Sequence, residues 1–149
     1  MKIVSWAKQG SLPWDIREDW NYFMETTKDG VLIMGRRCYE DFEGFAKTRK
    51  VIALSKDKSI EFPHAIKASS LQDGLGIAQK MNKTIWICGG RGIYEEALPL
   101  ADELYLTAIE GNFDGDIKFP QWEEHFPKEM SRHSVETGGY KLHFSIYGK

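Results

Sequence analysis

Val31-Leu32-Ile33-Met34-Gly35-Arg36-Arg37 joins a short apolar run to a glycine and two arginines. The run at 31–34 predicts a buried strand, and residues 37–42 predict a helix that begins beyond the glycine. The same design recurs where Trp86-Ile87-Cys88 is followed by Gly89-Gly90-Arg91-Gly92. Short, almost uniformly apolar strands that alternate with helices are typical of a mainly parallel sheet with helices on both faces. These two stretches therefore predict an α/β fold.

The rest of the chain fits this architecture as a single domain over residues 1–149, a length that allows one full core. Strands are predicted at residues 31–34, 51–54, 85–88, 104–109, 130–136 and 140–147. Helices are predicted at residues 18–26, 37–42, 71–81 and 92–98. Gly138-Gly139 lies between the last two strands, which predicts a C-terminal antiparallel hairpin at one edge of a twisted central sheet.

Composition favours a soluble protein of the cytoplasm. The net charge is −2, with 20 basic and 22 acidic residues, so the chain has no overall footprint for nucleic acid or a membrane surface. The start of the chain is too short for a signal peptide, and no run approaches membrane-spanning length. Cys38 and Cys88 have neither a disulfide-framework spacing nor a metal-ligand spacing. The four histidines are also scattered, so no metal site is predicted.

The segment from Leu12 to Phe23 places a carboxylate among aromatic side chains. Asp15 is predicted to cap a helix, with Glu18 three residues later in position to return a hydrogen bond. Spacings of three and four residues place four side chains on one face of this helix, namely Ile16, Asp19, Trp20 and Phe23. That face should point toward the core, where a carboxylate without partners is costly. Asp19 is therefore either tied up by structural donors or kept for a ligand.

Ligands of parallel α/β sheets usually bind at the carboxyl ends of the strands. The residues found there are Gly35-Arg36-Arg37-Cys38, Ser55-Lys56 and Gly89-Gly90-Arg91-Gly92. Helix N-termini and arginines both suit a phosphate, and glycines permit a close backbone approach. Neither glycine turn is a GxGxxG fingerprint or a Walker loop, and each alone is compatible with simple turn chemistry. Together they predict a phosphorylated cofactor.

The chain resembles the dihydrofolate reductase family in the order and spacing of its motifs across residues 10–120. The motifs that carry the resemblance are Leu12-Pro13-Trp14, Asp19 with Phe23 and Thr27, Met34-Gly35-Arg36, the run 49–55, Gly89-Gly90-Arg91-Gly92-Ile93-Tyr94, the run 98–107, Gly115-Asp116, and Phe119-Pro120. The resemblance implies that NADPH reduces 7,8-dihydrofolate to tetrahydrofolate, with hydride reaching C6 and a proton reaching N5.

The resemblance also implies roles for individual residues. Asp19 matches the active-site acid that hydrogen-bonds the pterin, and Trp14 and Thr107 match residues that support this acid and an ordered water. Arg49 matches the arginine that clamps the glutamate α-carboxylate, a task suited to guanidinium geometry. The other positions that match the substrate site are Leu12, Trp20, Phe23, Phe42, Ala46 and Cys88. Without the resemblance, Arg49-Lys50 would be interpreted as a solvated pair before a strand.

The positions that match the cofactor site are Gly35, Arg36, Arg37, Cys38, Leu54, Ser55, Lys56, Cys88, Gly89, Gly90, Arg91, Gly92, Ile93 and Tyr94. The cations among them favour NADPH over NADH, and the family's Gly89–Gly90 peptide is typically cis. Cys38 and Cys88 stand close to the expected nicotinamide and pterin, where they are interpreted as small buried apolar residues rather than reactive thiols. Arg91 either contacts phosphate or points to solvent.

The chain departs from the family pattern at two places. Fewer residues precede Leu12 than the family normally places there, so either residues 1–4 form a shortened first strand or the sheet has a gap at its middle. Ala46 is smaller than the usual leucine, which predicts a wider aminobenzoate pocket. Two alternatives remain open: a shortened relative that binds folate or NADPH with little turnover, and a related pteridine or pyrimidine reductase. The expected state is a cytoplasmic monomer that binds antifolates such as methotrexate or trimethoprim.

Overall fold

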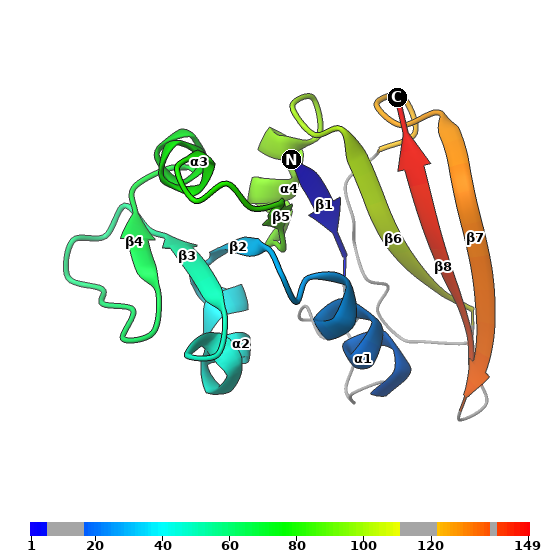
Figure 1. The fold of residues 1–149 in the computed structure, drawn as a ribbon, viewed down its shortest axis with the longest axis horizontal. Coiled ribbons are helices and arrows are strands. Elements are labelled where there is room, and N and C mark those ends of the chain that lie inside the picture. The colour runs from blue at the N-terminus through cyan, green and yellow to red at the C-terminus, as the bar shows by residue number, and fades with distance from the viewer. Residues whose placement is uncertain (6–16, 111–121, 138–139) are drawn as a thin grey trace.

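The computed structural model describes residues 1–5, 17–110, 122–137 and 140–149 of the protein (Figure 1). In chain order its elements are β1 (Lys2–Val4), α1 (Arg17–Thr26), β2 (Val31–Gly35), α2 (Arg36–Ala46), β3 (Lys50–Leu54), β4 (Ile66–Ala68), α3 (Leu71–Gln79), β5 (Ile85–Ile87), α4 (Arg91–Ala97), β6 (Glu103–Glu110), β7 (Lys128–Thr137) and β8 (Tyr140–Gly148). These strands form one sheet in the order β4-β3-β2-β5-β1-β6-β8-β7. The predicted α/β fold is confirmed.

The sheet is parallel from β4 to β6 and antiparallel beyond it. β8 runs antiparallel to β6, and β7 pairs antiparallel with β8, so the predicted C-terminal hairpin is present. β1 lies between β5 and β6, with Ile3 opposite both Ile87 and Leu104. Ile3 and Val4 are fully buried there. The first strand is therefore present in a short form, and the alternative of a gap in the sheet is wrong.

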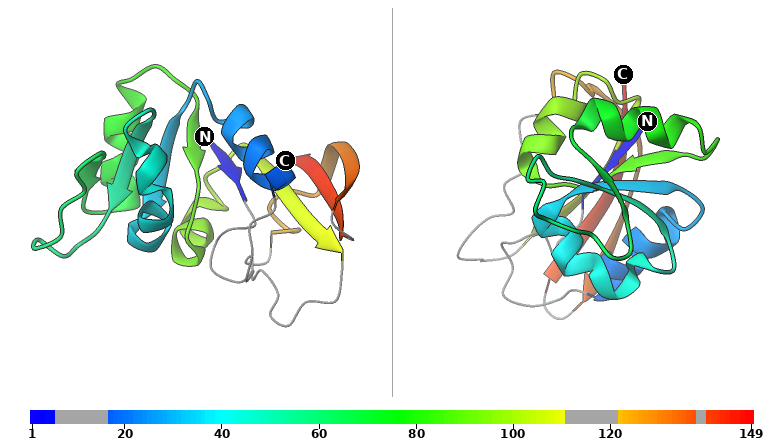
Figure 2. Two further views of the ribbon diagram at one scale, coloured as in Figure 1. Left: turned by 90° about the horizontal axis from the view of Figure 1, so that it is seen from below. Right: turned by 90° about the vertical axis from the view of Figure 1, so that its left-hand side faces the viewer.

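Alternation along the strands divides the core into two layers. In β2, Val31 and Ile33 face the layer that contains α3 and α4, whereas Leu32 and Met34 face the layer that contains α1 and α2. Figure 2 shows these two pairs of helices on opposite faces of the sheet. Phe42 of α2 is fully buried, which stabilises the fold by about 2–3 kcal/mol relative to an exposed side chain. Helices therefore cover both faces, as predicted.

Element ends differ from the predicted ends where tertiary contacts decide them. β4 was not predicted, because a three-residue strand is too short to show a pattern. α2 continues past Phe42 to Ala46, which is fully buried, so packing extends the helix beyond its strongest apolar residues. Gly74 lies inside α3 although glycine is a poor helix former. A Cβ at this position would lie 3.0 Å from Leu54 Cδ2, so glycine permits close helix–strand packing. No helix in the described ranges is long and apolar enough to cross a membrane.

Candidate functional site

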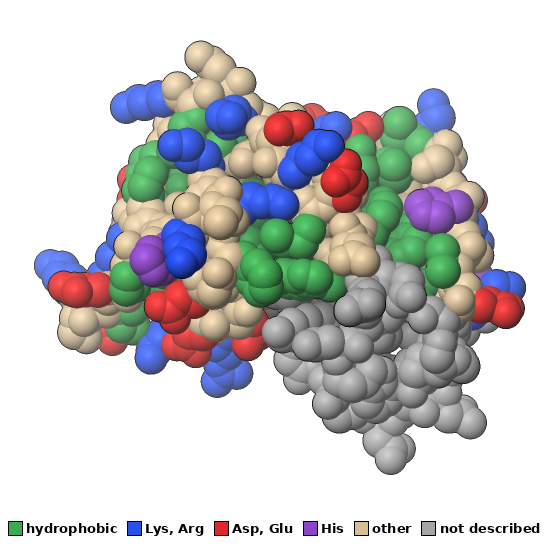
Figure 3. Space-filling view, turned by 60° about the horizontal axis from the view of Figure 1, so that its bottom comes forward, with side chains coloured by type: hydrophobic (Ala, Val, Ile, Leu, Met, Phe, Trp, Pro, Cys, Tyr) green, Lys and Arg blue, Asp and Glu red, His purple; other side chains and the backbone are tan. Residues whose placement is uncertain are grey.

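The candidate site begins at an aromatic cluster between α1 and α2. The ring of Trp20 lies 5.8 Å from that of Phe23, 6.0 Å from that of Phe42 and 4.9 Å from that of Phe45. Phe23 and Phe42 are fully buried, but Phe45 is 41% exposed. Figure 3 shows hydrophobic side chains at the surface beside the residues left undescribed. The structure thus brings together three predicted substrate residues, and buried Ala46 lies one residue after Phe45.

Phe45 is the residue of this cluster that the sequence interpretation missed. It follows Phe42 by three residues, so the two rings share one side of α2, with centroids 5.9 Å apart. The three-residue spacing from Phe42 was the feature of the sequence that could have identified Phe45. Its ring packs against Trp20 and Phe42 and extends the apolar surface outward from the core.

Arg49 lies at one end of the aromatic cluster and is held by the main chain of α1. Its Nη2 donates to the carbonyl of Met24 at 2.8 Å, and its Nη1 donates to the hydroxyl of Thr27 at 3.2 Å. Thr27 is itself fixed, because its hydroxyl donates to the carbonyl of Phe23 at 2.8 Å. A cation at the C-terminal end of a helix also interacts favourably with the helix dipole. Two of the five guanidinium N–H donors are used, and the rest can meet a carboxylate.

Partial burial lowers the pKa of Arg49, while Asp29 and Glu25 act in the opposite direction. An arginine remains protonated through such a shift. Arg49 precedes β3 in the chain, and contacts with residues 22 and 25 positions away hold it against the last turn of α1.

Thr107 of β6 is a buried polar residue to which the resemblance assigns a site role. Its main-chain N–H donates to the Ser5 hydroxyl at 2.9 Å, which joins the end of β1 to β6. The Thr107 side chain is only 8% exposed, and its own hydroxyl has no hydrogen-bond partner in the part of the chain that the structure describes. An unsatisfied buried hydroxyl costs about 1–3 kcal/mol, a cost that a bound polar ligand or a carboxylate removes.

Three other predicted site residues lie outside the described structure in whole or in part. Asp19 belongs to the first turn of α1, but its side chain lies outside the described structure. Leu12 and Trp14 fall in the range 6–16, which is likewise outside the described residues.

The carboxyl ends of β2 and β5 meet through glycine backbone. The N–H of Gly35 donates to the carbonyl of Gly89 at 2.7 Å, and the Gly89–Gly90 peptide is cis, as the family resemblance implied. Gly89 has a φ of 122°, which favours glycine. A Cβ on Gly35 would lie 2.9 Å from Ile93 Cδ1, so β2 and α4 approach closely. The glycines therefore allow two strand-to-helix turns to lie side by side.

The two cysteines and Tyr94 pack under these turns. The Cys38 thiol donates to the carbonyl of Cys88 at 3.4 Å, and the Tyr94 hydroxyl donates to the same carbonyl at 2.8 Å. Tyr94 also reaches the carbonyl of Val4 at 2.9 Å, so it joins β5 to β1. Burial, followed by the proximity of Cys38, raises the pKa of the Cys88 thiol well above its ordinary range. This thiol stays protonated, which supports its interpretation as a small buried apolar residue.

The predicted phosphate ligands lie at the surface beside these turns. Arg36 and Arg91 each pair with a glutamate four residues later, in both cases at 3.1 Å between Nε and Oε1. Register places Gly35 opposite Leu54, so the β3 end with Ser55 lies next to the turn after β2. The remaining predicted cofactor residues in this region are buried Leu54, partly buried Ile93, and exposed Arg37, Lys56 and Gly92. Within the described ranges, no cluster of His, Cys, Asp and Glu could hold a metal ion.

Comparisons with known proteins fit this geometry. A family model described as dihydrofolate reductase matches residues 6–149. The dihydrofolate reductase of Bacillus subtilis is 32% identical over 146 residues, covering 96% of this chain and 86% of the relative. That of Haemophilus influenzae is 33% identical over 143 residues, covering 94% of this chain and 88% of the relative. A solved structure of dihydrofolate reductase from Enterococcus faecalis, complexed with NADP(H) and RAB-propyl, matches with a TM-score of 0.83 and 25% identity and covers 99% of this chain and 95% of that one.

Proposed function

The chain belongs to the dihydrofolate reductase family, and from that premise we propose how its residues carry out the reaction. The protein is an NADPH-dependent oxidoreductase that reduces 7,8-dihydrofolate to 5,6,7,8-tetrahydrofolate. Neither the non-catalytic alternative nor the pyrimidine reductase alternative is favoured, because the relatives are dihydrofolate reductases over most of their length. The observation that carries the residue assignment is the arginine fixed at the end of an aromatic cluster.

The substrate lies between α1 and α2 in this proposal. Trp20, Phe23 and Phe42 form an apolar wall for the pterin and aminobenzoate rings, together with Ala46 and Leu12. Arg49 binds the α-carboxylate of the glutamate. Its contacts with the Met24 carbonyl and the Thr27 hydroxyl support this role, because they fix the guanidinium before a ligand arrives. Such preorganisation lowers the entropic cost of binding.

Asp19 is the proposed catalytic acid, with Trp14 and Thr107 supporting it. The carboxylate hydrogen-bonds the pterin ring and its amino group, and this bond favours protonation at N5. Asp19 lies in the first turn of α1, where the helix dipole stabilises a carboxylate. The buried Thr107 hydroxyl is available as a donor to the acid or to the pterin. Cys88 adds apolar surface beneath the pterin.

The glycine turns after β2 and β5 fit a dinucleotide. A Cβ added to Gly90 or to Gly92 would meet nothing within 4 Å, so open space lies beside the start of α4. Bound there, NADPH supplies the hydride. The backbone from Gly89 to Tyr94 holds its diphosphate and nicotinamide side, near Cys38. The adenosine-phosphate side would be held by Gly35, Arg36, Arg37, Ser55 and Lys56, with Leu54 as an apolar neighbour, and Arg91 would add a further cation.

The proposal also includes the domain organisation, the location, the oligomeric state and the inhibitors of the enzyme. Residues 1–149 act as one domain, and the enzyme is a cytoplasmic monomer. Antifolates such as methotrexate and trimethoprim compete with dihydrofolate, because their ring amino groups suit the Asp19 carboxylate.

The test of this proposal is turnover with and without the acid. Purified protein with NADPH and dihydrofolate should lose cofactor absorbance, and Asp19→Asn should abolish nearly all of this loss at neutral pH, because the amide cannot carry the negative charge. Asp41→Asn is the matched control, since Asp41 is an exposed acid of α2. Tight methotrexate binding without any turnover would contradict the proposed function. Full activity of Asp19→Asn would instead contradict the assignment of the acid.

A further inference from the structure

The loop that joins β3 to β4, residues 55–65, lies at the β4 edge of the sheet and begins with a turn made by polar side chains (Figure 1). The N–H of Asp57 donates to the Ser55 hydroxyl at 3.1 Å. The Asp57 carboxylate then accepts twice from Ser59, from its N–H at 2.9 Å and from its hydroxyl at 2.6 Å. These bonds from Ser59 lower the pKa of Asp57, because they favour the charged form. The start of the loop is therefore a compact turn beside the carboxyl end of β3.

Lys67 of β4 holds this turn from the neighbouring strand. Its Nζ donates to the carbonyl of Asp57 at 2.7 Å and to the carbonyl of Ile60 at 2.6 Å. Lys67 lies opposite Ala53 in the sheet register, so its main chain is fixed beside the end of β3. Two of the three donors of the ammonium group are used in these bonds. One side chain thus ties two points of the loop to the sheet.

The positive charge of Lys67 is not neutralised by these contacts. Both partners are carbonyl oxygens, and Lys67 forms no ion pair with a carboxylate among the residues that the structure describes. Arg36 and Lys67 also contribute to the lowered pKa of Asp57, so both cations lie near this carboxylate. Lys56, next to Asp57 in the chain, is an exposed third cation. A local surplus of positive charge of this kind attracts an anion.

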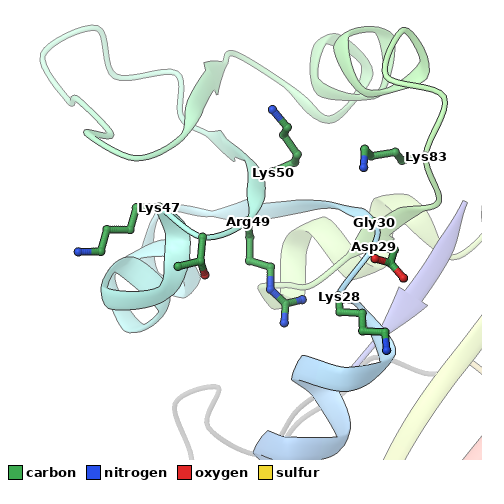
Figure 4. Close-up of a pocket in the computed structure, with 8 residues that line it drawn as sticks. Lys28, Asp29, Gly30, Lys47, Arg49, Lys50 and Lys83 are labelled. Atoms are coloured by element: carbon green, nitrogen blue, oxygen red, sulfur yellow. The ribbon is translucent and has the colours of Figure 1, made fainter.

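Cations at the opposite end of β3 do not converge in the same way. Arg49 and Lys50 line a cavity of about 310 Å³ at the amino end of this strand (Figure 4). In Figure 4 the Arg49 guanidinium and the Lys50 amine point to opposite sides. The carboxyl end differs because hydrogen bonds fix the main chain that carries its cations.

We propose that Lys67 is a positioning residue that sets the preference of the protein for NADPH over NADH. The inference rests on the proposed function, in which Ser55 and Lys56 meet the adenosine-phosphate side of the cofactor. Lys67 acts through the loop, because its hold on the carbonyls of Asp57 and Ile60 orders these two residues before a ligand arrives. Such preorganisation lowers the entropic cost of binding the 2′-phosphate, which NADPH carries and NADH lacks.

The test compares equilibrium binding of NADPH and NADH, measured by quenching of tryptophan fluorescence. Lys67→Met keeps most of the stem and removes both hydrogen bonds to the loop. The variant should bind NADPH about 3- to 10-fold more weakly, because the loop must now be ordered on binding, and its affinity for NADH should change less than about twofold. Lys67→Arg should restore most of the preference, since a guanidinium can donate to the same two carbonyls.

Lys58→Met is the matched control for charge. Lys58 is an exposed cation of the same loop, and its side chain makes no hydrogen bond or ion pair within the described part of the chain. Both substitutions remove one positive charge from this region, but only Lys67→Met removes hydrogen bonds. Lys58→Met should therefore keep the ratio of the two dissociation constants within about twofold of the wild type. Equal losses in the two variants, or a folded Lys67→Met with the wild-type ratio, overturn the proposal.

A second measurement uses the protein without cofactor. Lys67→Met should speed amide hydrogen exchange at Asp57, Ser59 and Ile60, whose N–H groups are hydrogen-bonded inside the loop. Unchanged exchange at these positions also overturns the proposal. Thermal melting checks that each variant is folded. If Lys67→Met does not fold, Lys67→Gln replaces it in both measurements with the same expected directions, because its amide is uncharged and shorter.

Failure of this inference differs from failure of the proposed function. Wild-type protein that shows no NADPH-dependent turnover of dihydrofolate counts against the proposed function. Normal turnover, combined with a preference for NADPH that Lys67→Met leaves intact, counts against the role of Lys67 alone.

Discussion

The proposed substrate end and the proposed cofactor end of the site both contain arginines, but they hold them in different ways. Arg49 is partly buried and bonds to the Met24 carbonyl and to Thr27, two groups fixed by α1. Arg36 and Arg91 are more than half exposed and pair with glutamates of their own helices. Exposed pairs at this spacing contribute only about 0.3–0.5 kcal/mol, so an anion can displace them easily.

The difference indicates two modes of anion recognition. At the substrate end the guanidinium is already oriented, so binding loses little side-chain entropy. At the proposed cofactor end, arginines that bind a phosphate would have to leave an intrahelical partner, and the glycine backbone would supply the fixed part of the site. Specificity for the carboxylate should therefore depend on one residue, whereas cofactor affinity should be spread over several.

Removal of Arg49 should produce the largest effect. Arg49→Ala should raise the dissociation constant of folate roughly 10- to 100-fold, since a hydrogen bond to a charged group is worth about 1.5–3 kcal/mol. The catalytic rate at saturation should change little, because the carboxylate is remote from the hydride acceptor. Steady-state kinetics and equilibrium binding measure the two quantities separately. Arg132→Ala, in which an exposed arginine of β7 is lost, is the control. An effect on the maximal rate alone would contradict the assignment of Arg49.

Loss of Arg36 should have a smaller effect, confined to the cofactor. Arg36→Ala should weaken NADPH binding by about 2- to 5-fold, because the exposed contact that we propose it makes to a phosphate is worth at most about 1 kcal/mol. Folate affinity should stay at the wild-type value. Titration with NADPH and with NADH distinguishes a contact to the 2′-phosphate, since NADH should be unaffected. Arg132 is again the matched position, because its Nε lies 3.9 Å from Glu129 in a similar exposed pair. If Arg36→Ala weakened NADPH binding as strongly as Arg49→Ala weakens folate binding, the two ends would not differ in their mode of anion recognition.

The two ends also differ in how far the sequence predicted them. The turns after β2 and β5 were predicted because uniform apolar strands followed by glycines are a local pattern. The hydrogen bonds of Arg49 were not predicted, since the Met24 carbonyl is a backbone group that any residue would offer. β1 illustrates the same limit: three residues carry no periodicity, and only pairing with β5 and β6 makes them the centre of the sheet. Phe45 was missed because its exposure hides it from a search for core residues.

The smallest effect is expected at the exposed Glu25–Lys28 pair, next to the partly buried hydrogen bonds of Arg49. Lys28 lowers the pKa of Glu25 below its ordinary value of 4.5, mainly through the hydrogen bond between them. Because the folded-state pKa is depressed, the pair stabilises the fold above the unfolded value and loses its contribution as the pH falls through the folded value. Glu25→Gln should therefore leave the melting temperature at pH 7 within error of the wild type. Below about pH 4.5 the melting temperature of the variant should fall less steeply with decreasing pH than that of the wild type. Melting curves across this range test the expectation. A large loss of stability at pH 7 would mean that the surface pair, rather than the main-chain ties, holds this end of the site.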